Sequence, residues 1–182
     1  MISLRAALRC PERVRALVLI DSDGGAEPPS KKLEYFVLGK VVRFLGIRPV
    51  LRIVLKKMFG STTQQRQPSL VREWEERFLQ VHAPSMLRVL KALNSRKDIS
   101  SRLSVLNVPC LILHGQEDQA LPPQRSKLLQ QSITGSRLEL IAEAGHLLAL
   151  EAPDKVNLFL QRWLSSFEQN STGERGADSR SD

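Results

Sequence analysis

The segment 108–150 limits the fold of this chain more than any other. It begins with a nearly continuous apolar run, 108–114, and a second strand-like segment, 137–141, follows about one helix later. Short continuous apolar runs are typical of strands that are covered on both faces, as in a parallel sheet. Pro122 and Pro123 favour the start of a helix between the two segments. The pattern therefore predicts a strand, a helix and a second strand within a parallel sheet.

Two polar residues follow these strands closely. Asp118 comes just after the first strand, and His146 lies in the loop after the second. Sites in open parallel sheets lie beyond the carboxyl ends of the strands, so we expect the two side chains to meet there. A carboxylate and a histidine form two thirds of a nucleophilic triad. Glu117 is also acidic, but it is one residue out of register and is expected to point elsewhere.

The remainder of the chain supports an α/β class with parallel pairing. A helix is expected over residues 1–9, and a third buried strand over 14–20 runs into a turn at 21–25. Residues 26–107 are expected to be mostly helical, with no strand. Pro153 favours the start of a last helix. The apolar stripe of that helix consists of Val156, Phe159, Leu160, Trp163, Leu164 and Phe167.

Composition narrows the class of protein. No apolar run reaches the ~18 residues that a membrane-spanning helix needs, and the N-terminus is not typical of a signal peptide. Cys10 and Cys110 lie far apart, which favours reduced, buried thiols in a cytoplasmic protein. Residues 168–182 are polar, small and charged, and a disordered tail is expected there.

The positive charge is concentrated in one segment. Residues 31–57 contain eight basic residues and one acidic residue, so they supply seven of the eight net positive charges. No nucleic-acid-binding motif accompanies them, and no nucleic-acid partner is expected. Two interpretations remain open. The segment could close a pocket with its apolar side, or it could lie on an anionic membrane surface.

A family resemblance joins these features. The sequences PERVRALVLID (11–21), VPCLILHGQEDQALPP (108–123) and AEAGHLLALEAPDKVNLFLQRWL (142–164) resemble the C-terminal part of an α/β-hydrolase fold protein. The resemblance covers residues 1 to about 167. It includes a Gly-x-x-Asp-x-x-x-Pro signature at Gly115, Asp118 and Pro122, and a Gly-His pair at Gly145 and His146.

The resemblance implies a domain organisation and a set of roles. Residues 1–25 and 108–167 would form part of the hydrolase core, with about three strands, and 26–107 would be an inserted helical cap. Asp118 would be the triad acid and His146 the general base, acting on an ester, lactone or similar bond of a small molecule. Asp21 is an alternative acid, because some members of the family keep their acid after the preceding strand. No organic cofactor and no metal are expected. His82 and His114 are expected to be structural.

One part of the family pattern is missing. These 182 residues contain no Gly-x-Ser-x-Gly elbow, and Ser3 lacks flanking glycines. Residues 1–9 resemble the helix that follows the elbow. We therefore expect a truncated member whose complete form holds the serine, whereas hydrolysis by this chain alone is doubtful.

Two further expectations follow. The strand over 14–20 would have a bare edge, so the isolated chain is expected to be poorly stable or to depend on a partner. The alternative to an enzyme is a non-catalytic binding protein that docks on a membrane surface or a partner chain through its basic amphipathic segment. The sequence does not indicate an oligomeric state.

Overall fold

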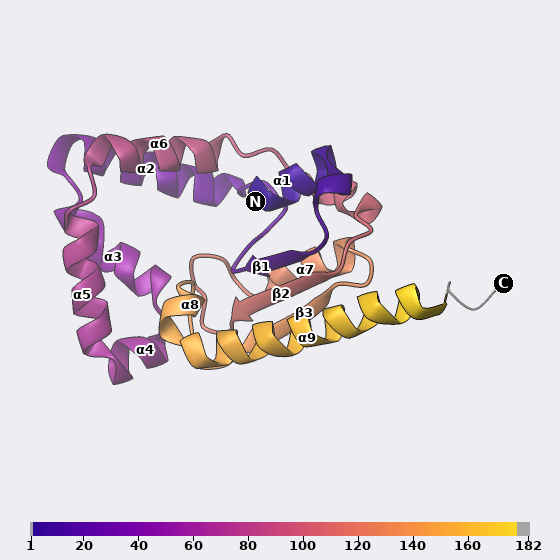
Figure 1. Ribbon diagram of the computed structural model, residues 1–182. Coiled ribbons are helices and arrows are strands. Elements are labelled where there is room, and N and C mark those ends of the chain that lie inside the picture. Colours follow the sequence, from indigo (N-terminus) through magenta and orange to yellow (C-terminus); the bar gives the residue numbers. More distant parts are fainter. Residues whose placement is uncertain (1, 178–182) are drawn as a thin grey trace.

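Three parallel strands form the centre of the molecule (Figure 1). The computed structural model describes residues 2–177 of the chain, and the side chains of residues 2–166. The strands are β1 (Leu17–Ile20), β2 (Cys110–Gly115) and β3 (Arg137–Ile141), in the order β1-β2-β3. Leu17 pairs with Cys110, and Leu111 pairs with Arg137. Every residue of β2 is buried, as its continuous apolar run predicts.

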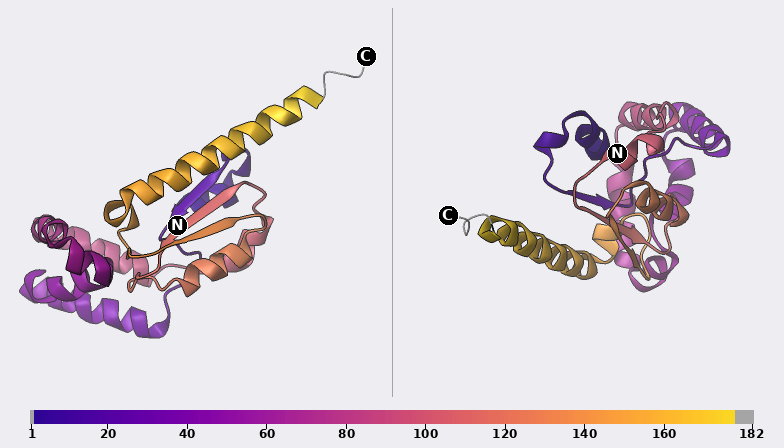
Figure 2. Two further views of the ribbon diagram at one scale, coloured as in Figure 1. Left: turned by 90° about the horizontal axis from the view of Figure 1, so that it is seen from below. Right: turned by 90° about the vertical axis from the view of Figure 1, so that its right-hand side faces the viewer.

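Helices cover both faces of this sheet (Figure 2). Elements α1 (Ile2–Arg9), η2 (Ser100–Val105) and α7 (Gln124–Ser132) pack on one face, and η1 (Pro11–Arg13) connects α1 to the sheet. The opposite face is covered by α8 (Leu148–Glu151) and α9 (Pro153–Ala177). Alternate residues of β2 enter the two resulting cores. Cys110 and Ile112 pack toward α1 and α7, whereas Leu111 and Leu113 pack toward α9.

Five helices gather beyond the carboxyl ends of the strands, and we call residues 29–94 the helical block (Figure 1). They are α2 (Pro29–Leu45), α3 (Arg48–Met58), α4 (Ser61–Arg66), α5 (Pro68–Leu79) and α6 (Ala83–Asn94). The block has its own apolar core, centred on Val42, Leu51, Leu55 and Phe59. Helices α2 and α6 run side by side above this core. The block thus stands over the edge of the sheet where Asp118 and His146 are expected.

The expected class and the three parallel strands are confirmed, with small differences in the elements. Strand β1 begins at Leu17 rather than Val14, because Val14 still closes the 3-10 turn with a hydrogen bond to the carbonyl of Pro11. Shortly after Asp98, in the stretch expected to be mostly helical, the chain forms the 3-10 helix η2. Asp98 still accepts a hydrogen bond from the Ser100 N–H, 2.7 Å away.

The expectation of two buried thiols is confirmed for one cysteine and not for the other. Cys110 is buried, as expected, and burial raises the pKa of its thiol to about 11. Cys10 is only partly buried, because it lies in the connection between α1 and η1. The part of the chain that the structure describes contains no helix long and apolar enough to cross a membrane.

Of the tail expected over 168–182, the backbone of 168–177 is helical and continues α9, and 178–182 lie outside the described residues. The division into core and cap stays a prediction.

Candidate functional site

The end of β2 positions Asp118. After Gly115 the chain turns sharply, and the N–H of Asp118 donates to the carbonyl of Gly115, 3.3 Å away. One carboxylate oxygen, Oδ1, accepts from the Leu121 N–H at 2.7 Å. The carboxylate is buried completely. This local bond orients Asp118 in its turn and leaves its second oxygen, Oδ2, for another partner.

The loop after β3 carries His146 and packs tightly on β2. A Cβ atom at Gly115 would overlap the carbonyl oxygens of Ala144 and Gly145, so only glycine fits there. From the other side, the helical block approaches Gly145 equally closely at Gly60. The N–H groups of His146 and Leu147 both donate to the carbonyl of Met58, at 2.9 and 3.2 Å. The position of His146 is therefore set by both the sheet and the helical block.

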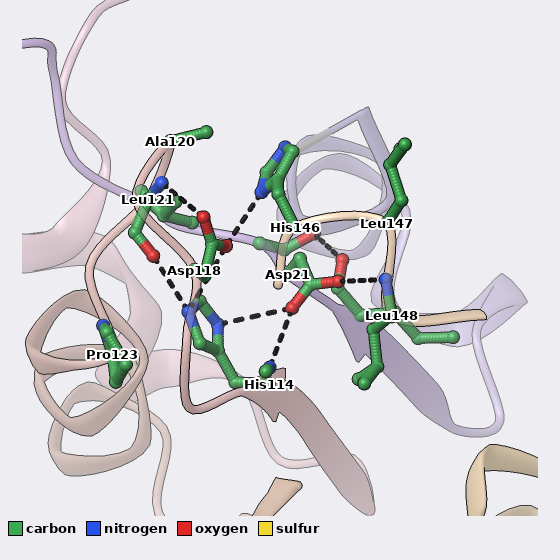
Figure 3. A network of polar contacts seen from close by, with 12 residues as sticks. Asp21, His114, Asp118, Ala120, Leu121, Pro123, His146, Leu147 and Leu148 are labelled. Atoms are coloured by element: carbon green, nitrogen blue, oxygen red, sulfur yellow. Dashed lines mark hydrogen bonds and ion pairs between the residues drawn. The ribbon is translucent and has the colours of Figure 1, made fainter. Parts of the chain in front are cut away.

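Asp118 and His146 meet in a direct hydrogen bond. Nδ1 of His146 lies 2.7 Å from Oδ2 of Asp118 (Figure 3). The other ring nitrogen, Nε2, points away from the carboxylate. Burial lowers the pKa of His146, but the hydrogen bond and the negative charge of Asp118 outweigh it, and the pKa stands above its ordinary value. The pair can therefore stabilise an imidazolium, as a general base requires.

Asp21 lies behind this pair at the end of β1. It has a left-handed backbone conformation, with φ of 44°, and its oxygens accept from the N–H groups of Gly115 at 3.1 Å and Leu148 at 3.2 Å. Burial raises its pKa to about 7. The carboxylate that is hydrogen bonded to His146 is thus Asp118 and not Asp21. Asp21 instead ties the end of β1 to the end of β2 and to the loop after His146.

His114 connects Asp21 and Asp118 (Figure 3). Its Nε2 lies 2.8 Å from the Leu121 carbonyl, which it can reach only as a donor, and 3.4 Å from Asp118 Oδ2. Its Nδ1 lies 3.7 Å from Asp21 Oδ1 and has no hydrogen-bond partner among the described residues. Burial lowers the pKa of His114, so the neutral imidazole is favoured. The residue expected to be merely structural lies directly against the acid of the pair.

Asp21, His114 and Asp118 bring possible ligand atoms within 4.8 Å of one another. Both carboxylates already accept hydrogen bonds on each oxygen, and Nε2 of His114 serves as a donor. A cation would have to displace several of these bonds. The donor set therefore fits a hydrogen-bonded network, and the expectation of no metal stays a prediction.

His146 opens into a cavity of about 440 Å³ between the sheet and the helical block. Near the sheet the cavity is bounded by Asp21, Leu121 and His146. Charged side chains of the helical block also reach it, including Glu34 and Lys57, which form an ion pair. Most of its lining is apolar and comes from the helices; it includes Leu38, Val54, Phe78, Met86, Leu90 and Leu93.

Two carboxylates fasten the helical block to the site. Glu151 is buried and accepts from the N–H groups of Gly60 at 2.8 Å and Leu147 at 3.0 Å. Glu117 accepts from the Thr62 N–H at 2.7 Å at the start of α4. Burial alone would raise the pKa of Glu117, but hydrogen bonds from Thr62 and Ser61 outweigh it and lower the pKa. Glu117 thus points away from His146, as its register predicts.

Sequence patterns identified only part of this arrangement. The motif residues Asp118 and His146 are brought together, whereas the contributions of His114, Glu151 and Gly60 were missed. The position of His114 between two aspartates requires the pairing of β1 with β2, which no local pattern contains. Gly60 gave a weak signal, since it follows an apolar helix and precedes polar residues.

Comparison with known proteins places the chain in a family. Residues 1–167 match the Ndr family. The chain belongs to the Ndr family. Curated relatives include the 2-hydroxymuconate semialdehyde hydrolase of Pseudomonas putida, 26% identical over 169 residues that make up 90% of this chain and 58% of that protein. The pimeloyl-(acyl-carrier protein) methyl ester esterase of Nitrosomonas europaea is 26% identical over 164 residues, 85% of this chain and 63% of the esterase.

Solved structures agree with this assignment of the fold. A thermophilic esterase from Thermogutta terrifontis superposes with a TM-score of 0.83 at 22% identity, over 91% of this chain and 61% of the esterase. An enol-lactonase from Burkholderia xenovorans gives 0.79 at 20% identity, over 89% and 60%. The resemblance to the α/β-hydrolase fold is therefore confirmed. This Ndr family chain spans about three fifths of the length of these hydrolases.

Proposed function

We propose that Asp118 and His146 are the acid and the base of a Ser–Asp–His triad that hydrolyses an ester, lactone or similar bond of a small molecule with an apolar group. The observation that carries the proposal is the 2.7 Å hydrogen bond between Nδ1 of His146 and the buried carboxylate of Asp118, at the opening of a largely apolar cavity. The similarity to hydrolases and an esterase gives independent support.

Each side chain has a defined task in this reaction. Asp118 accepts the Nδ1–H bond, so it holds the tautomer whose free Nε2 can take a proton. Nε2 removes the proton of the serine hydroxyl as the serine oxygen attacks the carbonyl carbon. The imidazolium then gives this proton to the departing alkoxide. Water repeats the sequence on the acyl-enzyme and releases the acid.

The serine is the part that these 182 residues do not supply in an elbow motif. We propose that the complete protein provides it from a segment that is not among them. The coding sequence upstream of the Met1 codon tests this directly. An in-frame Gly-x-Ser-x-Gly stretch followed by residues 1–9 is expected there, and a stop codon with an initiation signal would favour the non-catalytic binding protein.

The chemical test uses that longer protein and a fluorophosphonate probe, which labels activated serines. Labelling is expected to slow by a factor of roughly 10³–10⁴ in His146→Ala and Asp118→Asn, as in other triads. His82→Ala is the matched control, because His82 is exposed in the helical block and should leave the rate unchanged. Equal labelling of the His146→Ala protein and the wild type would refute the proposed triad.

A further inference from the structure

Helix α2 presents an apolar face to solvent. Leu33, Phe36, Val37 and Phe44 follow helical spacing, so they lie on one side of α2. Their exposed fractions are 64%, 58%, 53% and 73%. Single exposed apolar residues are common, but four on one side of a helix, with two phenylalanines on either side of Lys40, are typical of an interaction surface. We call these four residues the outer row of α2.

The outer row is not the side of α2 that packs in the fold. The opposite side carries Val42, which is 1% exposed, and Leu38, which packs in the core of the helical block. Tyr35 and Leu38 also line the cavity next to His146. A helix that is apolar on all sides is normally buried. Here one apolar side is covered by the protein itself, and the other is left free among the described residues.

Cations accompany the exposed rings. The ammonium group of Lys40 lies 5.3 Å from the ring centre of Phe36, and the guanidinium group of Arg43 lies 5.9 Å from that of Phe44. The one acidic residue of α2, Glu34, forms an ion pair with Lys57. The outer row is therefore combined with positive charge, and the single acidic side chain of its helix is already paired with Lys57.

We propose that the outer row of α2 docks on an anionic lipid surface. Phe36, Phe44 and their aliphatic neighbours would enter the boundary between headgroups and acyl chains, while Lys40 and Arg43 would bind phosphate and carboxylate groups at headgroup level. This division of labour is the one found in interfacial amphipathic helices. The concentration of seven of the eight net positive charges in residues 31–57 adds long-range attraction to the same surface.

The positive charge beside the outer row favours an anionic membrane over a second copy of the chain as the binding partner. A second copy of the chain would bring Lys40 and Arg43 of two helices together, and like charges oppose such a contact. An acidic membrane removes that repulsion and needs no complementary groove. The helix, 17 residues long, would lie along the surface over roughly 25 Å. The docking is independent of the proposed hydrolysis, because no outer-row residue contacts Asp118 or His146.

The test is co-sedimentation of the purified full chain with vesicles. Vesicles of phosphatidylcholine alone are compared with vesicles that contain about one third phosphatidylserine. Binding is expected to the phosphatidylserine vesicles and to weaken with added salt. Lys40→Glu/Arg43→Glu and Phe36→Ser/Phe44→Ser should each lower the partition coefficient at least about tenfold.

Matched controls change exposed basic and exposed apolar residues on the sheet side of the molecule. Arg102→Glu/Lys127→Glu reverses two exposed charges, and Val105→Ser/Leu128→Ser removes two exposed apolar groups. Both control variants should bind as the wild type does. Circular dichroism verifies that all four variants remain folded, which their exposure favours.

Three results would overturn the proposal. The first is no binding to phosphatidylserine vesicles, or equal binding to phosphatidylcholine alone. The second is an equal loss in the control variants, which would make the attraction a property of net charge and not of α2. The third is a wild-type dimer in size-exclusion chromatography that Phe36→Ser/Phe44→Ser dissociates, since a second copy would then cover the outer row.

Discussion

The two ends of the helical block are built in opposite ways. At its base, around Met58–Gly60, the block contacts the loop of His146 through main-chain hydrogen bonds, glycine contacts and the carboxylate of Glu151. At its top, α2 leaves the outer row exposed. Apolar residues at the base, such as Phe59, pack in the core next to the site, whereas those on the outer side of α2 contribute little to the fold. The residues that fix the site and those that are exposed to solvent are thus separated within the helical block.

Two phenylalanines give the largest contrast. Phe59, at the base, is 0% exposed, and Phe44, at the top, is 73% exposed. Phe59→Ala is expected to lower the free energy of unfolding by about 4 kcal/mol, because it leaves a cavity in a packed core. Phe44→Ala should change it by less than about 0.5 kcal/mol. Urea denaturation measures both, and equal losses would show that the outer side of α2 is packed after all.

Substitution of two glycines by alanine is expected to change the free energy of unfolding in opposite directions. Gly115→Ala is expected to cost about 3 kcal/mol, since its Cβ would overlap the backbone of the His146 loop. Gly39→Ala in α2 meets only ordinary contacts with Leu87 and Leu90, both at 3.8 Å, and should stabilise by about 0.5–1 kcal/mol through helix propensity. Urea denaturation of the two variants provides the comparison. Destabilisation by Gly39→Ala would mean that α2 and α6 pack more tightly than the structure indicates.

The carboxylate at the base gives a smaller effect. Both oxygens of Glu151 accept backbone N–H groups, from Gly60 and Leu147. Glu151→Gln presents an amide N–H to one of these donors, and the loss is expected to be about 2 kcal/mol. Glu76→Gln, on the exposed side of α5, serves as the control with a change near zero. Thermal unfolding that shifts equally in both variants would contradict a role for Glu151 in fastening the block.

A pH titration examines the network behind the site. The pKa of Asp21 is raised to about 7, so the folded chain keeps a proton that the unfolded chain releases near pH 4. The stability of the wild type should therefore fall relative to Asp21→Asn as the pH rises from about 4 to about 7, by at most about 1.4 kcal/mol per pH unit. Urea denaturation at several pH values measures the difference. Parallel curves for the two proteins would show that Asp21 is ionised throughout.

Local patterns were sufficient for the sheet and for one side of the site. The apolar run of β2 is nearly continuous, β3 carries Leu138, Leu140 and Ile141, and Asp118 and His146 follow the two strands at the spacing of a known motif. The residue at which β1 begins was less well defined. Val14 and Ala16 are as apolar as the strand itself, and only the turn after Pro11 keeps them out of the strand. Glu117 was placed correctly from its register alone.

Contacts between distant segments explain what sequence patterns missed. His114 lies between Asp21 and Asp118 only after β1 and β2 have paired, and Gly60 meets Gly145 only after the block has folded onto the sheet. The periodicity of α2 was also ambiguous. With apolar residues on two sides, it indicates a helix but does not reveal which side is covered.

The carbonyl of Met58, which accepts the N–H groups of both His146 and Leu147, limits how this protein can be recombined. A chimera that replaced the whole of 29–94 would leave the N–H of His146 without this acceptor, at about 1–3 kcal/mol, unless the donated segment returned a carbonyl to the same place, whereas the N–H of Leu147 would keep its bond to Glu151. Exchanges that keep 58–62 native avoid this loss. Segments 29–57 and 68–94 are therefore natural units for grafting cavities of other shapes onto this sheet.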